Sequence, residues 1–153
     1  MKRQRRTVGS ILQVQLAESV FCYAQILDKQ FVFFDYKSNK ELLDSELDCL
    51  EKAAPLFYLS VYKDVVTKSR WLIKGKLALR QEFHSVPMQF IQDGELFELY
   101  NPNTGEITPA TYEECKCLEY AATWEASHVE DRLRDHFNGV SNKWVESLKP
   151  KRN

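Results

Sequence analysis

Residues 8–36 have the sequence VGSILQVQLAESVFCYAQILDKQFVFFDY, in which three apolar runs are separated by short polar turns. Residues 8–16 alternate apolar and polar side chains, which is typical of a half-buried strand. Residues 19–27 form a second strand-like run, and the link at 17–18 is short enough for a hairpin. Residues 31–36 are so apolar that we expect both faces of this strand to be covered. This stretch therefore predicts an antiparallel meander, twisted into a small barrel-like sheet of the Src-homology-3 type.

The residues after the meander predict one short helix and further antiparallel strands. SELDCLEKAA at 45–54 changes to a helical period, and Ser45 and Asp48 have the spacing of a capping box. Strand-like segments follow at LFYLSVYK (56–63), WLIKGKLAL (71–79), MQFIQ (88–92) and ELFELYN (95–101). Gly75 indicates a bend or bulge in the second of these segments. Asp93-Gly94 favours a tight hairpin between the last two, because glycine reaches positive φ without strain.

Residues 111–137 carry the clearest helical pattern. Thr111 and Glu114 form a capping box, and an apolar stripe follows them. The stripe consists of Cys115, Leu118, Ala122, Val129 and Leu133. Glu130 lies four residues before Arg134, which predicts a solvent-facing ion pair. We predict one helix or two in succession, packed on the sheet, so that the fold class is α+β with a long C-terminal helical region.

Length and composition indicate one ordinary domain. The chain has 153 residues, of which 44% are hydrophobic, and we expect a single domain over 1–153 with an ordered core at about 7–148 and basic, mobile termini. The 21 basic and 22 acidic residues leave a formal charge of -1, so no overall field favours nucleic acid or an anionic membrane. The chain has no apolar run of 18 residues and no signal-peptide pattern at its start, so a cytoplasmic protein with reduced thiols is expected.

No motif in the chain ties a residue to a reaction. Phosphate-binding loops, dinucleotide-binding turns, nucleophile elbows and zinc-protease pairs are all missing from the sequence. Cys115-Lys116-Cys117 has one residue between the thiols, too few for a usual zinc site. We therefore predict no catalytic residue, no metal ligand and no cofactor. An enzyme that uses His128 with a nearby carboxylate is the weakest alternative.

The charged side chains leave two kinds of binding open. The basic N-terminus, with Lys2, Arg3, Arg5 and Arg6, is the natural place for nucleic-acid contact, so a nucleic-acid-binding module is the alternative function. Acidic clusters instead favour a basic protein partner, although a solvated helix face is the commoner explanation of such a cluster. The candidate partner-binding carboxylates are Asp44, Glu46, Asp48, Glu51, Asp93, Glu95 and Glu98.

Several segments together resemble a known family, the Immunity protein 26 family of bacterial polymorphic toxin systems. They are VGSILQVQL, YAQIL at 23–27, FFDY at 33–36, WLIKGKLAL, FIQD at 90–93 and HVEDRLRDHFNG at 128–139. The ordered set extends over about residues 7–148. Members of the family often carry an acidic residue after the first glycine, so Ser10 is a departure that leaves the role of this position open.

The resemblance implies a non-catalytic protein that protects the producing cell by binding a toxin. Its partner would be the C-terminal domain of a cognate toxin in the cytosol, bound by a monomer of this chain, with no nucleic acid or membrane involved. Nuclease domains are commonly basic because they engage phosphates, so the acidic clusters agree with a nuclease toxin. The resemblance transfers no functional residue position by position. We expect HVEDRLRDH to be either the packed spine of a helix or part of the surface that faces the toxin.

Overall fold

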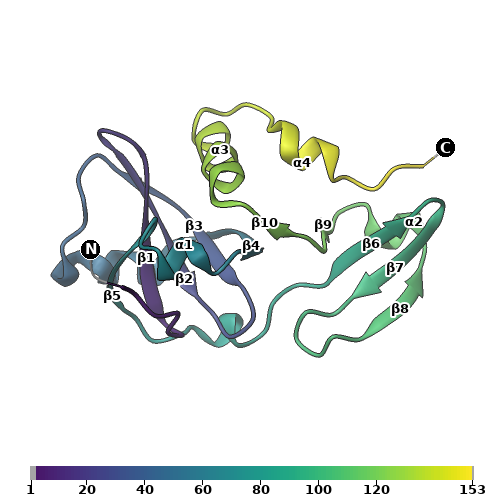
Figure 1. The fold of residues 1–153 in the computed structure, drawn as a ribbon, viewed down its shortest axis with the longest axis horizontal. Coiled ribbons are helices and arrows are strands. Elements are labelled where there is room, and N and C mark those ends of the chain that lie inside the picture. The colour runs from purple at the N-terminus through teal and green to yellow at the C-terminus, as the bar shows by residue number, and fades with distance from the viewer. Residues whose placement is uncertain (1–2, 153) are drawn as a thin grey trace. The chain divides into compact units, whose positions relative to one another are not determined.

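The computed structural model describes residues 3–152, which form two compact units. Among these residues, unit 1 holds those up to His84 together with Thr123–Glu130, and unit 2 holds Ser85–Ala122 and the residues from Asp131 onward. Each unit has its own sheet (Figure 1). That the two units fold as the single predicted domain, with a core at 7–148 and mobile ends, stays a prediction.

Unit 1 is built on a six-stranded sheet with the strand order β10-β4-β3-β2-β1-β5. Its strands are β1 (Ser10–Ala17), β2 (Val20–Ile26), β3 (Phe31–Ser38), β4 (Pro55–Val61), β5 (Leu72–Lys76) and β10 (Thr123–Trp124). All neighbours are antiparallel except β10 and β4, which run parallel. The meander predicted from residues 8–36 is confirmed as β1, β2 and β3, and β4 continues it.

The barrel-like closure predicted for this sheet is wrong. Strand β5 pairs with β1 at one edge and the two-residue β10 pairs with β4 at the other, so the sheet stays open. Closure would need the two edge strands to pair with each other. A strand of two residues that already runs parallel to β4 offers too few hydrogen bonds for that.

Strand β3 forms the centre of the core of unit 1. Phe31, Val32, Phe33 and Phe34 are all at most 2% exposed, which confirms the expected covering of both faces for the first four residues of the run at 31–36. Phe33 and Phe34 point to opposite faces, since neighbours on a strand alternate. The ring of Phe33 lies edge-on to Trp71 at a centroid distance of 5.7 Å, and Phe34 lies 6.1 Å from Phe83.

The short helices of unit 1 are η1 (Asp44–Lys52), α1 (Asp64–Thr67) and η2 (Gln81–His84). Element η1 is a 3-10 helix where the sequence predicted a helix over 45–54. It begins with a reciprocal pair, since Leu43 N donates to Glu46 Oε1 at 2.8 Å and Glu46 N donates to Leu43 O at 2.8 Å. The pair that starts the helix therefore lies two residues before the predicted Ser45 and Asp48.

Gly75 brings η1 and β5 close together. The register of β1 and β5 shifts next to Gly75, which confirms the predicted bulge. A Cβ atom at position 75 would overlap the Asp44 side chain and would lie 2.6 Å from Leu47 Cδ1. Since Leu47 is 1% exposed, its side chain has little room to move.

Unit 2 is built on a four-stranded sheet with the order β8-β7-β6-β9. Its strands are β6 (Gln89–Asp93), β7 (Leu96–Tyr100), β8 (Ile107–Ala110) and β9 (Glu119–Tyr120), and its short helices are α2 (Tyr112–Cys115) and α4 (Lys143–Ser147). The hairpin predicted at Asp93-Gly94 is confirmed, with Gly94 at φ 63°. Strand β9 runs parallel to β6, while the other neighbours are antiparallel.

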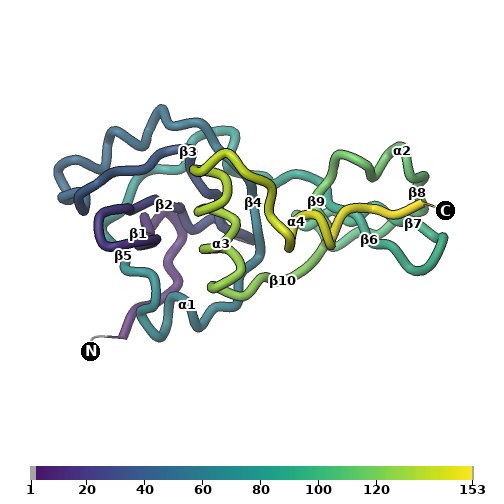
Figure 2. The backbone as a smooth tube through the Cα atoms, turned by 90° about the horizontal axis from the view of Figure 1, so that it is seen from above, coloured from purple at the N-terminus to yellow at the C-terminus, as the bar shows by residue number. Residues whose placement is uncertain are grey.

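The predicted α+β class and a C-terminal helix packed on the sheet are confirmed, but a helical region that runs through 111–137 is wrong. Helix α2 has four residues, the chain then extends through β9 and β10, and α3 (Ala126–Phe137) follows as the only long helix among residues 3–152 (Figure 2). Pairing of β9 with β6 and of β10 with β4 replaces the helical hydrogen bonds that the apolar spacing suggested. The capping box of Thr111 and Glu114 is confirmed, because each backbone N–H donates to the other side chain.

We expect Gly75→Ala to destabilise the protein by about 1–3 kcal/mol, because the added methyl group overpacks the contact between η1 and β5. Urea unfolding at fixed pH would measure the change. Lys76→Ala, at an exposed position of the same strand, is the matched control and should change stability by less than about 0.5 kcal/mol. Equal stability of the two variants would contradict the close approach.

Candidate functional site

Four of the seven candidate carboxylates lie on η1 and form what we call the acidic η1 surface. They are Asp44, Glu46, Asp48 and Glu51, and all four residues are exposed. Leu47 and Leu50 on the same element are buried, at 1% and 0% exposure. Packing of these two leucines against the sheet therefore turns the carboxylates toward solvent.

Part of the negative charge near η1 is already engaged within the protein. The carboxylate of Glu46 accepts the Leu43 N–H and so holds the start of η1. Glu41, just before it, accepts from Gln13 Nε2 at 2.9 Å and from Lys74 Nζ at 3.3 Å. These contacts, the Gln13 hydrogen bond first, lower the pKa of Glu41 below its usual value. Asp48 and Glu51 are the acids of this surface that lie farthest along η1 from these contacts.

A tyrosine side chain is linked to the same element. A hydrogen bond with the Cys49 side chain, followed by burial and by the nearby charges of Cys49, Tyr23 and Glu46, raises the pKa of Tyr36 to about 12. The phenol therefore keeps its proton at neutral pH and adds no negative charge beside η1.

The other three candidate carboxylates lie in unit 2, on the hairpin of β6 and β7. Asp93 ends β6, Glu95 lies in the turn and Glu98 is in β7. The register pairs Asp93 with Leu96 and Ile91 with Glu98. The seven residues thus form two separate groups, one in each compact unit, and their contact with a toxin stays a prediction.

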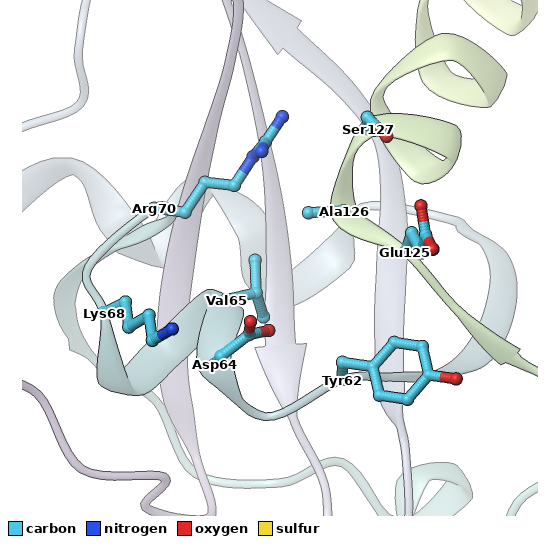
Figure 3. A pocket seen from close by; sticks show the side chains of 8 residues that line it. All are labelled: Tyr62, Asp64, Val65, Lys68, Arg70, Glu125, Ala126 and Ser127. Carbon is cyan, nitrogen blue, oxygen red and sulfur yellow. The ribbon is translucent and has the colours of Figure 1, made fainter.

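Unit 1 also contains a pocket of about 510 Å³ that the sequence did not suggest. Its lining residues are Tyr62, Asp64, Val65, Lys68, Arg70, Glu125, Ala126 and Ser127. They come from the α1 segment and from the junction of β10 with α3, and Arg70 points toward Ser127 (Figure 3). No local signal could have revealed this pocket, because the parallel pairing of β10 with β4 brings segments 60 residues apart together.

A buried carboxylate fixes one side of this pocket. Glu130 is 8% exposed and accepts from Arg70 Nη2 at 2.7 Å and Arg70 Nε at 3.0 Å. It also accepts from Trp71 Nε1 at 2.8 Å. The Glu130 hydrogen bond raises the pKa of Arg70. The predicted solvent-facing position of Glu130 is therefore wrong. Arg134 bonds to Asp131 at 3.1 Å, and its predicted pairing with Glu130 stays a prediction.

The three histidines lie on two separate elements. His84 lies in η2, and His128 and His136 lie eight residues apart on α3. The ring of His128 has its Nε2 4.0 Å from Glu125 Oε2, and that of His136 stacks edge-on against Phe137 at 5.0 Å. Among residues 3–152 no group of three or more histidine, cysteine and acidic side chains is placed to hold a metal ion. The four cysteines are free, with Cys22 and Cys115 buried and Cys49 and Cys117 exposed.

Gln4 and Arg6 of the N-terminal segment bond to the backbone of unit 1. Gln4 Nε2 donates to Val66 O at 3.0 Å and to Trp71 O at 2.8 Å, where the segment passes α1 (Figure 2). Arg6 Nη2 donates to Leu27 O at 2.7 Å, and burial lowers the pKa of this guanidinium. The Arg6 side chain therefore contributes to the fold through this bond. Lys2 lies outside the described residues.

A family model described as Immunity protein 26 matches residues 7–97. The chain belongs to this family. Immunity proteins neutralise a cognate toxin and are typically binders without enzymatic activity. The family match ends before residues 128–139. That this segment contributes to the resemblance therefore stays a prediction. Comparison with curated proteins and with solved structures gave no significant match.

The match with the Immunity protein 26 family contains most of unit 1 and the start of the β6–β7 hairpin. It therefore includes the acidic η1 surface, Asp93 and Glu95, but not Glu98. Within residues 3–152, no helix has the length and apolar character needed to span a membrane.

We expect Glu130→Gln to lower the free energy of unfolding by about 1–3 kcal/mol, because the buried amide cannot reproduce the charged bonds to Arg70 and leaves a polar group without a partner. Glu125→Gln, one turn earlier with a side chain that is 66% exposed, is the matched control. Thermal and urea unfolding of both variants would measure the difference. A Glu130→Gln protein as stable as the control would contradict the structural role of this carboxylate.

Proposed function

We propose that this chain neutralises the C-terminal domain of a cognate toxin by binding it directly, as a monomer, through acidic surface. Family membership carries the proposal, since it implies a cognate toxin as partner. Among the described residues, no group of three or more histidine, cysteine and acidic side chains is placed to hold a metal ion. Inhibition by contact is then the simplest way for such a protein to act.

The negative charge of the exposed carboxylates favours a toxin with a basic surface. Exposed carboxylates on η1 and on the β6–β7 hairpin would attract a positive surface and speed its encounter. A nuclease is the proposed toxin, because an enzyme that engages phosphates needs such a surface. Neutralisation would take place in the cytosol, before the nuclease reaches its substrate.

The proposal is tested with the toxin domain encoded beside this gene. Cells that express both proteins should grow, and the two should co-purify as a 1:1 complex. Raising the salt concentration from about 0.05 M to 0.5 M should slow association by about tenfold or more, because the attraction acts between exposed charges. Surface plasmon resonance would measure the association rate at each salt concentration.

Two results would contradict this function. The first is a chain that neither binds the toxin domain nor protects the cells. The second is salt-dependent binding of the chain itself to DNA or RNA without the toxin, which would favour the nucleic-acid-binding alternative. Filter binding at low salt, with the full chain and with an Arg3→Ala, Arg5→Ala variant, distinguishes these outcomes.

A further inference from the structure

The sheet of unit 2 has one covered face and one open face. Phe97 lies 5.9 Å from Tyr112 of α2, and Phe90, two positions away by register, lies 5.2 Å from Tyr120. Gln92, on the same face, bonds to the backbone of Lys151 at 2.7 Å and 2.8 Å. Helix α2 and the C-terminal segment therefore cover the face that carries Phe90, Gln92 and Phe97.

The opposite face, which we call the outer face, combines apolar and acidic side chains. Because side chains alternate along a strand and paired residues share a face, the register assigns its members. They are Gln89, Ile91, Asp93, Leu96, Glu98, Tyr100, Ile107 and Pro109. Gln89 is buried at 4% exposure, so the open part of the face begins at Ile91. Leu96 is 72% exposed and Ile107 is 50% exposed, so each end of the face carries an exposed large apolar side chain.

The charge of residues 85–122, which contain the three strands, is strongly one-sided, whereas residues 131–152 of the same unit hold six basic and three acidic residues. Residues 85–122 contain seven acidic residues and a single basic one, Lys116, whose Nζ bonds to Glu113 at 2.7 Å. Arg152 lies at the covered side, 4.3 Å above the ring of Tyr112. Toward β9, Arg132 is neutralised by two bonds to Glu119, at 2.6 Å and 3.0 Å. Among the described residues, the side chains of Asp93 and Glu98 on the outer face take part in no hydrogen bond or ion pair.

We propose that the outer face of β6, β7 and β8 is the docking surface for the toxin, and that it fits a partner surface that combines basic and apolar side chains. This inference rests on the proposed function above. Leu96 and Ile107 would be the apolar anchors, with Asp93 and Glu98 fixing orientation by pairing with lysine or arginine. A second copy of this chain is a poor occupant, because two acidic faces repel each other.

The toxin would dock on the face of the sheet and not extend it at the edge. Strand β8 is the outer strand, and its Pro109, opposite Glu98, has no N–H to donate to an added strand. Three strands about 4.8 Å apart and about 17 Å long present roughly 250 Å², about a third of the usual area per partner. The outer face would thus be the centre of a larger contact.

The acidic η1 surface is less suited to this role. Glu46 holds the start of η1, and Glu41 is paired with Lys74. Leu43 is 66% exposed, and it is the only exposed large apolar side chain in residues 40–52. Variants of the η1 region therefore serve as the comparison, because they remove the same kinds of side chain from unit 1.

The test compares variants of the full chain for binding to the purified C-terminal domain of the toxin encoded beside it. Leu96→Ala and Ile107→Ala should each raise Kd by about tenfold, mainly through faster dissociation. The double variant Asp93→Asn, Glu98→Gln should slow association and flatten its dependence on salt. Surface plasmon resonance at two salt concentrations separates these effects.

The comparison variants on η1 are Leu43→Ala and the double variant Asp48→Asn, Glu51→Gln, which should raise Kd less than the outer-face variants do, because the η1 carboxylates would attract the toxin without contacting it. All variants change exposed or half-exposed side chains, so circular dichroism and thermal unfolding should match the unaltered chain. Protection of cells from the toxin should weaken in the same order as binding.

Three outcomes would overturn the docking surface. Loss of affinity in the η1 variants alone would place the contact on unit 1, and unchanged Kd in all variants would exclude both surfaces; in each case the proposed function would stand. Self-association of the chain that Leu96→Ala abolishes would make the outer face a contact between copies. If the unaltered chain neither binds nor protects, the proposed function fails and this inference fails with it.

Discussion

The carboxylate of Glu130 joins two segments of unit 1 that lie about 60 residues apart in the sequence. It accepts two hydrogen bonds from Arg70 and one from the indole of Trp71. The other side of that indole lies edge-on to Phe33 in the centre of the core. A charge buried in this way persists only when its partners satisfy it, so the start of α3 is fixed to the segment after α1. The pocket lined by both segments depends on the same contact.

The sequence predicted the elements whose signals are local. The meander and the β6–β7 hairpin follow from alternation and short turns, and both are present. The long helix at 111–137 was wrong because its apolar spacing was interrupted by two strands of two residues each. Those strands pair in parallel with β6 and β4, which lie about 30 and 60 residues away. Pairing between residues so far apart in the sequence produces no recognisable pattern in a short segment.

Only part of the candidate site could be predicted from the sequence. Charge alone identified the acidic residues of η1 and of the hairpin. It did not distinguish Glu46, which holds the start of a helix, from Asp48 and Glu51, because that difference lies in a backbone hydrogen bond. The outer face of unit 2 was closer to prediction: once the hairpin at Gly94 is assumed, alternation places Asp93, Leu96 and Glu98 on one side. The exposure of Leu96 needed the structure, since a leucine in a strand is usually buried.

A net charge of -1 suggests a protein that attracts neither basic nor acidic partners, but the sum does not show how the charges are distributed. Residues 85–122 hold seven of the 22 acidic residues and one of the 21 basic ones. At physiological salt a charge is felt over about 8 Å, so a partner responds to the few side chains near it and not to the total. An acidic face on a neutral chain gains attraction for one basic surface without the self-repulsion of a highly charged protein. A small protein that must recognise a single partner can thus combine a stable core with a strongly charged contact surface.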